Sequence, residues 1–342
     1  MEKIATIGLD LAKQVFQVHG MDRNGKKVLT RKLDRSEVKP FFKKLRKCVV
    51  GMEATGGAHF WAREIAALGH RVLIMPGQYV KPFVKRGKTD ALDAEGIAIA
   101  ATQPGMPSVK VKSASEQAVI TTMKTRMLYV RERTSAINAL RGLLAEFGHV
   151  APAKRANVVK LRELLTSIDA QIPEPAKLEL LGVFEHIEAL DARIERLTNE
   201  IAKRVDADEN ISRLTTIPGV GAITAAMVRA VVPDPSQFKS ARHFASWLGL
   251  TPRSLSSGGS QRLGRISKRG NSTLRSLLIV GACAVVVRAR QKDRRVSWIA
   301  SLSKRKPFLV AAVAVANKNA RVLWALMMKG GVFEPRKPAA TG

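Results

Sequence analysis

Four carboxylates occupy positions in the sequence where a metal site could form. Asp90 and Asp93 lie in the stretch KRGKTDALDAEGIAIAA (85–101), and their spacing of three residues places them on one face of a helix. Asp10 ends the strand-like stretch KIATIGLD, and Glu53 lies in CVVGMEATGG, where glycines let ligands approach closely. Such acids can meet at one edge of a sheet. They would suit two Mg²⁺ ions about 3.5–4 Å apart, an arrangement that supports phosphodiester cleavage.

Three of the four acids also have a plainer interpretation. Asp90 and Asp93 could be first-turn helix acids favoured by the helix dipole, and Asp10 could begin a turn. The tripeptide GKT (87–89) resembles the end of a phosphate-binding loop, but that motif requires glycine where the chain has Pro82. An ATPase is therefore disfavoured, and the four acids together favour a metal site.

The charge balance indicates a polyanionic partner. The 342 residues contain 58 Lys plus Arg and 28 Asp plus Glu, a net charge of +30. Neutralising phosphates is what such a surplus does well, so nucleic acid is the expected partner. No membrane association is expected, because the apolar runs 277–287 and 308–316 are shorter than the ~20 residues of a spanning helix. No signal peptide opens the chain, and its two cysteines lack metal-ligand spacing, so a cytoplasmic location is expected.

The elements that must position the acids alternate between strands and helices. The first ~100 residues predict the order βββ-α-β-α-β-α, which mixes a hairpin meander with parallel crossovers. The last predicted helix begins near Thr89, which is a good N-cap residue. The fold class is thus α/β plus all-α, with a metal-dependent catalytic domain over residues 1–114.

Two long helical stretches follow, over 116–148 and 177–205, with charged outer faces. We expect an antiparallel hairpin, a coiled-coil arm over 115–208, that acts as a spacer or a dimerisation element. A mostly helical domain is expected over 209–330, and a disordered tail over 331–342.

Two stretches of the last domain suit phosphate binding. TTIPGVGAITA reads as a helix–hairpin–helix turn in which Gly219 and Gly221 expose backbone amides, although a plain helix-to-helix turn is equally consistent. Residues 251–295 contain eleven Lys plus Arg and one acid. The segment SLSSGGSQRLGRISKRG within them is either a flexible phosphate-binding loop or the carrier of a nucleophilic serine among arginines. The residues alone do not choose among Ser254, Ser256, Ser257 and Ser260. The expected phosphate contacts are Arg253, Arg262, Arg265, Lys268 and Arg269.

The motifs IGLDLAK, GMEATGG, KTDALDAEGIA, IPGVG, FASWLGLTPR and SGGSQRLGRISKRGN, in this order, resemble the DEDD-type transposases of the insertion-sequence one-ten family. They are especially similar to its eleven-eleven subgroup, and the resemblance covers about residues 1–330. It implies a ribonuclease-H-like, RuvC-like first domain with Asp10, Glu53, Asp90 and Asp93 as the metal ligands. Mg²⁺ is the implied ion, with Mn²⁺ as a substitute.

The resemblance also implies a mechanism. The family's nucleophilic serine falls on Ser257, with Ser256 as the shifted alternative, and would form a covalent phosphoserine intermediate. The implied partners are donor and target double-stranded DNA, a structured guide RNA encoded by the element, and further copies of the chain, a dimer assembling to a tetramer.

Two alternatives stay open. A junction-resolving nuclease would use metal-activated water and need no serine. A non-enzymatic nucleic-acid-binding protein would need neither the serine nor the carboxylates.

Overall fold

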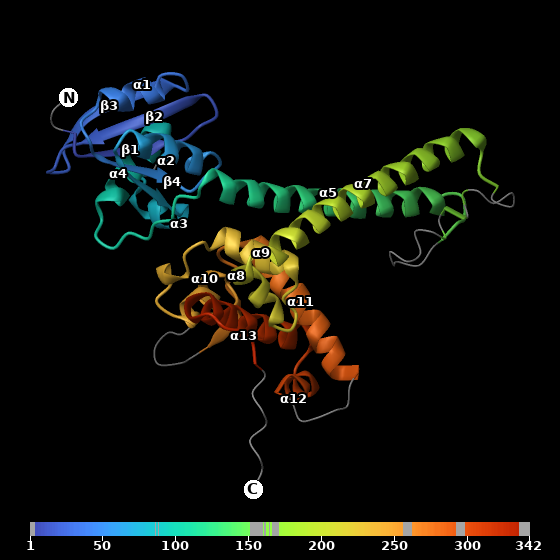
Figure 1. Ribbon diagram of the computed structural model, residues 1–342. Coiled ribbons are helices and arrows are strands. Elements are labelled where there is room, and N and C mark those ends of the chain that lie inside the picture. The colour runs from blue at the N-terminus through green and yellow to red at the C-terminus, as the bar shows by residue number, and fades with distance from the viewer. Residues whose placement is uncertain are drawn as a thin grey trace, which may run out of the picture. The chain divides into compact units, whose positions relative to one another are not determined.

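The structure is a computed structural model that describes residues 4–85, 87, 89–150, 160, 162–163, 165, 171–255, 262–291 and 298–334. The chain divides into two compact units, Met1–Gln117 and Ala118–Gly342. Figure 1 shows the elements of each unit along the chain. The finer division of unit 2 into an arm and a C-terminal domain stays a prediction.

Unit 1 contains a five-stranded mixed sheet with the order β3-β2-β1-β4-β5, of which Figure 1 labels β1 to β4. β1 pairs antiparallel with β2 and parallel with β4, and β4 pairs parallel with β5. This is the predicted combination of a hairpin meander with parallel crossovers. The strands are β1 (Thr6–Asp10), β2 (Val15–Met21), β3 (Lys27–Asp34), β4 (Val49–Glu53) and β5 (Arg71–Met75).

Residues of β1 alternate between two covered faces of the sheet. Ile7 and Leu9 belong to a hydrophobic core that includes residues of the helices α1 (Val38–Lys44) and α2 (Ala58–Ala67). Gly8 faces helix α4 (Asp90–Thr102) instead. Because strand side chains alternate with a period of two, Asp10 falls on the same face as Gly8. The same alternation on β4 puts Glu53 on the face of Gly51.

Helix α4 begins where the sequence predicts. The Thr89 Oγ1 accepts a hydrogen bond from the Leu92 N–H at 3.3 Å, which satisfies one of the free amides of the first turn. The short helix α3 (Gly77–Val80) and the 3-10 helix η1 (Lys81–Phe83) lie between β5 and α4, and they were not predicted.

Two long helices lie side by side in unit 2, the first of which begins in the last four residues of unit 1. Helix α5 (Ala114–Ala145) and helix α7 (Glu174–Asp206) run antiparallel. Arg126 Nε donates to Thr198 Oγ1 at 2.7 Å, and Arg133 pairs with Asp191 at 2.6 Å. The predicted connection at 149–158 lies mostly outside the described residues.

The described residues of the rest of unit 2 are mostly helical. Helices α11 (Ser272–Gln291) and α13 (Phe308–Lys329) are long and apolar enough to cross a membrane, by length and composition only. Each contributes one face to a hydrophobic core, as expected of core helices. The helices are 20 and 22 residues long, however, so the expectation that these segments are too short to span a membrane was wrong. The remaining elements are α8 (Glu209–Ser212), η3 (Arg213–Thr216), α9 (Ala222–Val231), η4 (Pro235–Gln237), α10 (Ala241–Trp247), β6 (Pro252–Ser254), β7 (Leu263–Ile266) and α12 (Trp298–Arg305).

Candidate functional site

Two strand glycines allow α4 to lie directly on the sheet. A Cβ atom at Gly8 would lie 2.0 Å from the Ala94 carbonyl oxygen, and one at Gly51 would lie 2.7 Å from Ala101 Cβ. Any larger residue would push the helix away from β1 and β4. The close approach brings the first turn of α4 to the ends of β1 and β4, where the acids of those strands lie.

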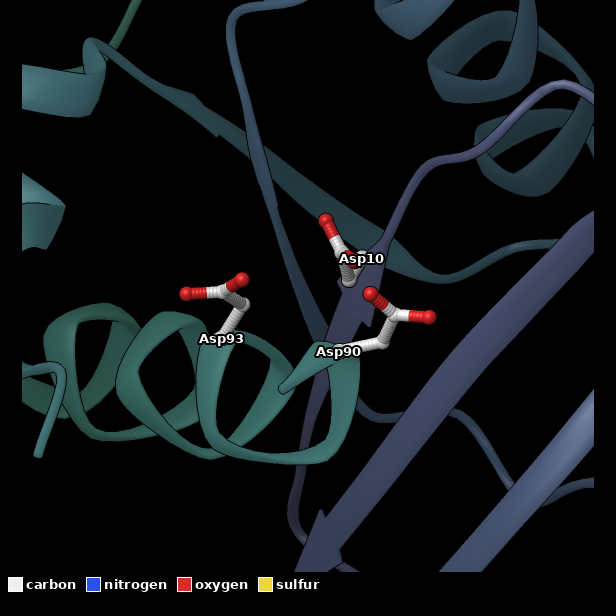
Figure 2. A group of neighbouring side chains, drawn as sticks. All are labelled: Asp10, Asp90 and Asp93. Carbon is white, nitrogen blue, oxygen red and sulfur yellow. The ribbon is translucent and has the colours of Figure 1, made fainter. Parts of the chain in front are cut away.

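Three aspartates converge at this edge of the sheet. Each of Asp10, Asp90 and Asp93 has a carboxylate oxygen within 4.8 Å of one from each of the others. Figure 2 shows Asp90 and Asp93 on the beginning of α4, beside Asp10 at the end of β1. Asp10 and Asp93 are partly buried and Asp90 is exposed, so the group is open to a substrate on one side.

The concentration of negative charge changes the acidity of Asp10. Burial, followed by the charges of Asp93, Asp90 and Glu53, raises the pKa of Asp10 to about 6, although a hydrogen bond from the Leu11 backbone acts in the opposite direction. Among the residues that the structure describes, no Lys or Arg forms an ion pair with these carboxylates. A partly buried carboxylate cluster that has no ion pair with any described cation fits a divalent metal ion.

Glu53 lies beside this group without being part of it. Burial and then the charge of Asp93 raise the pKa of Glu53. A Cβ atom at Gly77 would lie 2.1 Å from Glu53 Oε1, so the carboxylate rests against the start of α3. The structure thus brings three of the four predicted ligands together and the fourth within electrostatic range.

The glycines that bring the acids together were missed in the sequence. Gly8 and Gly51 face small residues of α4, among them Ala94, Ala98 and Ala101. Two sequence patterns could have predicted this packing. Each of two strands has a glycine two residues before its acid, and residues 94–101 contain alanines at helical spacing. Together these patterns indicate a helix packed against a sheet at close range.

The predicted serine segment, residues 254–270, includes the last residue of β6 and the whole of β7, two strands that were not predicted. β6 and β7 form a two-stranded antiparallel sheet, and the Leu255 N–H donates to the Arg262 carbonyl oxygen at 2.8 Å. Ser254 ends β6 and is exposed. Ser256, Ser257 and Ser260 lie in 256–261, outside the described residues. The described residues on either side, 252–255 and 262–266, therefore belong to a β-hairpin.

The predicted phosphate contacts beside this hairpin are all exposed or partly exposed; they are Arg253, Arg262, Arg265, Lys268 and Arg269. Arg253 Nη2 donates to the Ser267 carbonyl at 3.2 Å. Arg275 Nη1 donates to the carbonyls of Leu248 at 3.0 Å and of Arg269 at 2.9 Å, which fixes the turn after β7. A cavity of about 1660 Å³ borders the hairpin, but no carboxylate is among the described residues that line it.

The two glycines of the predicted helix–hairpin–helix turn differ in their surroundings. Gly219 has a φ of 84° and would place a Cβ atom 2.7 Å from the Gly281 carbonyl of α11, so tight packing accounts for glycine there. Gly221 is exposed at the start of α9, and a Cβ atom added to it would meet no described atom within 4 Å. Of the two glycines, Gly221 is the one whose described surroundings leave room for a phosphate beside the backbone.

Comparison with known proteins identifies the family. Residues 7–149 match the DEDD transposase family of the IS110 type, and residues 211–298 match the family described as "Transposase IS116/IS110/IS902 family". IS110 is the insertion-sequence one-ten family of the resemblance described above.

Similar proteins cover nearly the whole chain. A "Probable family 20 transposase" of Pseudomonas aeruginosa is 48% identical over 97% of this chain and 99% of its own length. The transposase for IS1328 of Yersinia enterocolitica is 36% identical over 97% and 99%. The transposase for IS1111A of Coxiella burnetii is 37% identical over 96% and 91%. The chain therefore belongs to the IS110/IS1111 family of DNA transposases, with a RuvC-like DEDD fold in its first unit.

Proposed function

We propose that this transposase cuts and exchanges DNA strands at a Mg²⁺ site made by Asp10, Glu53, Asp90 and Asp93. The observation that carries the proposal is the convergence of Asp10, Asp90 and Asp93 within 4.8 Å in a chain of net charge +30. Two bound Mg²⁺ ions, or Mn²⁺ in their place, would stabilise charge on the attacking and leaving oxygens. The carboxylates would hold the ions through oxygen atoms, the ligands that Mg²⁺ prefers.

Ser257 is the proposed nucleophile. Its Oγ forms a bond to the DNA phosphorus while one phosphorus–oxygen bond to a sugar breaks. The serine proton leaves to solvent, and the departing sugar oxygen takes up a proton. Attack by a sugar hydroxyl of the second strand reverses these steps, restores the serine and joins the strands. Because the phosphoserine keeps the energy of the ester bond, the exchange needs no ATP.

The basic residues of the hairpin bind and orient the DNA. Arg253, Arg262 and Arg265 present forked donors that match phosphate oxygens and stabilise the charge of the transition state. Lys268 and Arg269, in the turn after β7, add further phosphate contacts, as do the amides near Gly219 and Gly221. Such contacts fix the register on DNA without reading its sequence.

In this proposal, a structured RNA encoded by the element selects the donor and target DNA sequences by base pairing with them. The positive charge permits an RNA partner as well as DNA. The α5–α7 hairpin is the proposed coiled-coil dimerisation arm. Two exchanged duplexes favour a tetramer in which carboxylates and serine come from different protomers.

The test is covalent capture of labelled DNA carrying the element ends, in Mg²⁺ and with RNA from the native locus. We expect the wild-type chain and Ser256→Ala to form a denaturant-resistant protein–DNA adduct. Ser257→Ala should bind DNA but form no adduct, because it lacks the attacking oxygen. Asp10→Asn should also bind DNA and form none, because a metal ligand is lost.

The outcomes separate the alternatives. Cleavage that persists in Ser257→Ala without an adduct would establish a nuclease that uses metal-activated water. Element movement that survives loss of all four carboxylates would establish a non-enzymatic binding protein. An adduct in Ser257→Ala that disappears in Ser256→Ala would move the nucleophile by one residue.

A further inference from the structure

A second charged feature of unit 1 lies at the end of the sheet opposite the carboxylates. A cleft of about 810 Å³ includes Val49 and Arg71, the first residues of β4 and β5, together with Ala5 just before β1. β1 and β4 run parallel, with Asp10 and Glu53 at their other ends. At about 3.3 Å per residue, the five residues of each strand separate cleft and carboxylates by roughly 15 Å.

The cleft is strongly cationic. Four of its lining residues are basic, namely Arg23, Arg46, Lys47 and Arg71. Among the described residues, no carboxylate forms an ion pair with any of the four. Lys47 Nζ donates to the Leu68 carbonyl, which orients the ammonium without neutralising it. Cations gathered in a cleft, with no ion pair to any described carboxylate, attract an anionic partner.

The one carboxylate among the described lining residues, Asp22, offsets one of the four positive charges and leaves a surplus of three. Asp22 Oδ1 accepts hydrogen bonds from the backbone N–H groups of Asn24 and Lys26, each at 2.9 Å. These bonds shape the turn between β2 and β3, in which Gly25 has a φ of 79°. Asp22 therefore holds the turn that carries Arg23 at the rim of the cleft.

We propose that this cleft binds the phosphate backbone of a nucleic acid at a place separate from the carboxylate site. Arginine and lysine donors from three different segments suit a run of phosphates. No aromatic side chain is present among the described residues that line the cleft, so bases have no surface on which to stack. The contact is thus to phosphates and independent of base sequence.

The experiment compares two double variants of the full-length chain. Arg46→Gln/Arg71→Gln removes two charges from the cleft. Lys32→Gln/Lys124→Gln removes two exposed charges that do not line it. Binding is measured by fluorescence anisotropy against salt concentration, with a duplex DNA and an RNA hairpin of matched length.

Loss of two phosphate contacts should lower the slope of log affinity against log salt by about 2 for the duplex, with at least about ten-fold weaker binding at low salt. The control variant should keep the wild-type slope. Weakening with RNA alone assigns the cleft to RNA, weakening with DNA alone assigns it to DNA, and weakening with both assigns it to either backbone.

Equal slopes for the two variants with both probes would overturn the proposal. Thermal unfolding of each variant shows whether it is folded, and Arg23→Gln provides a second test because Arg23 lies on an exposed turn. Since Asp10→Asn keeps the cleft intact, failure of the cleft prediction and failure of the metal-site prediction give different results.

Discussion

At the scale of the residue, the ionised form of Asp10 is disfavoured by the fold itself. Burial and three neighbouring carboxylates raise its pKa to about 6 from an ordinary value of 3.8. The pKa of Asp10 is higher in the folded chain than in the unfolded one. Its contribution to the free energy of unfolding is therefore complete below pH 3.8 and is lost as the pH rises through 6. In the metal-free protein, this site therefore contributes less stability at neutral pH than in acid.

This reasoning predicts the behaviour of Asp10→Asn, which is isosteric but uncharged. In chelator, the free energy of unfolding of the wild-type chain should fall relative to that of the variant, by about 1 kcal/mol between about pH 4 and 7, with solvent screening taken into account. Urea unfolding at several pH values measures the difference. Parallel pH dependences of the two proteins would contradict the assignment.

A divalent metal ion should reverse this loss of stability of the wild-type chain at neutral pH. Adding Mg²⁺ or Mn²⁺ at about pH 7.5 should raise the Tm of the wild-type chain, since an ion that binds only the folded state stabilises it. The Tm of Asp10→Asn should rise much less. Lys85→Gln is the matched control, because it breaks the Lys85–Glu95 ion pair at 2.6 Å and leaves the four acids in place.

At the scale of the element, the position of α4 depends on a strand residue that bears no functional group. Gly8→Ala would force its Cβ atom into the Ala94 carbonyl, so α4 must shift. We expect a loss of about 2–3 kcal/mol in stability together with weaker metal binding. Gly56→Ala is the control, since a Cβ atom there meets no described atom within 4 Å. Unchanged metal binding in a folded Gly8→Ala protein would show that α4 tolerates the shift.

A substitution of the N-cap residue of α4 provides a second test, with a smaller expected loss of stability. Thr89→Ala removes the side-chain acceptor of the Leu92 N–H, which keeps its hydrogen bond to the Thr89 carbonyl, and should cost about 1 kcal/mol. The first turn holds Asp90 and Asp93, so fraying there should weaken metal affinity as well. Thr89→Ser keeps the acceptor and should restore both. Isothermal titration with Mn²⁺ measures the affinity.

Much of unit 1 could be predicted from local pattern. Alternating strands, the Thr89 cap and the spacing of Asp90 and Asp93 are encoded within short windows of sequence. The orientation of Glu53 toward Gly77 could not be predicted, because it depends on how α3 packs after β5. Strands β6 and β7 were missed since the serine- and glycine-rich composition of 254–270 is typical of a loop. The basic cleft was missed because its cations are far apart in the sequence.

At the scale of the whole molecule, a net charge of +30 leaves the free chain with strong self-repulsion, which a bound polyanion relieves. Protein purified from cells that carry the native gene and its flanks should retain a discrete RNA that maps beside the gene. Sequencing of the bound nucleic acid tests this, and light scattering tests for a dimer or tetramer. A heterogeneous mixture of nucleic acids would favour direct DNA recognition, and a monomer on nucleic acid would refute the assembly.

The carboxylates and the basic cleft lie at opposite ends of the same parallel strands. A variant that has lost catalytic activity should therefore still bind nucleic acid through the cleft. A cell that expresses Asp10→Asn beside the wild-type chain should therefore show fewer movements of the element than a cell with the wild-type chain alone. The inactive copies would occupy element ends and enter mixed assemblies. Removing the cleft arginines from the inactive copy should relieve this dominant interference.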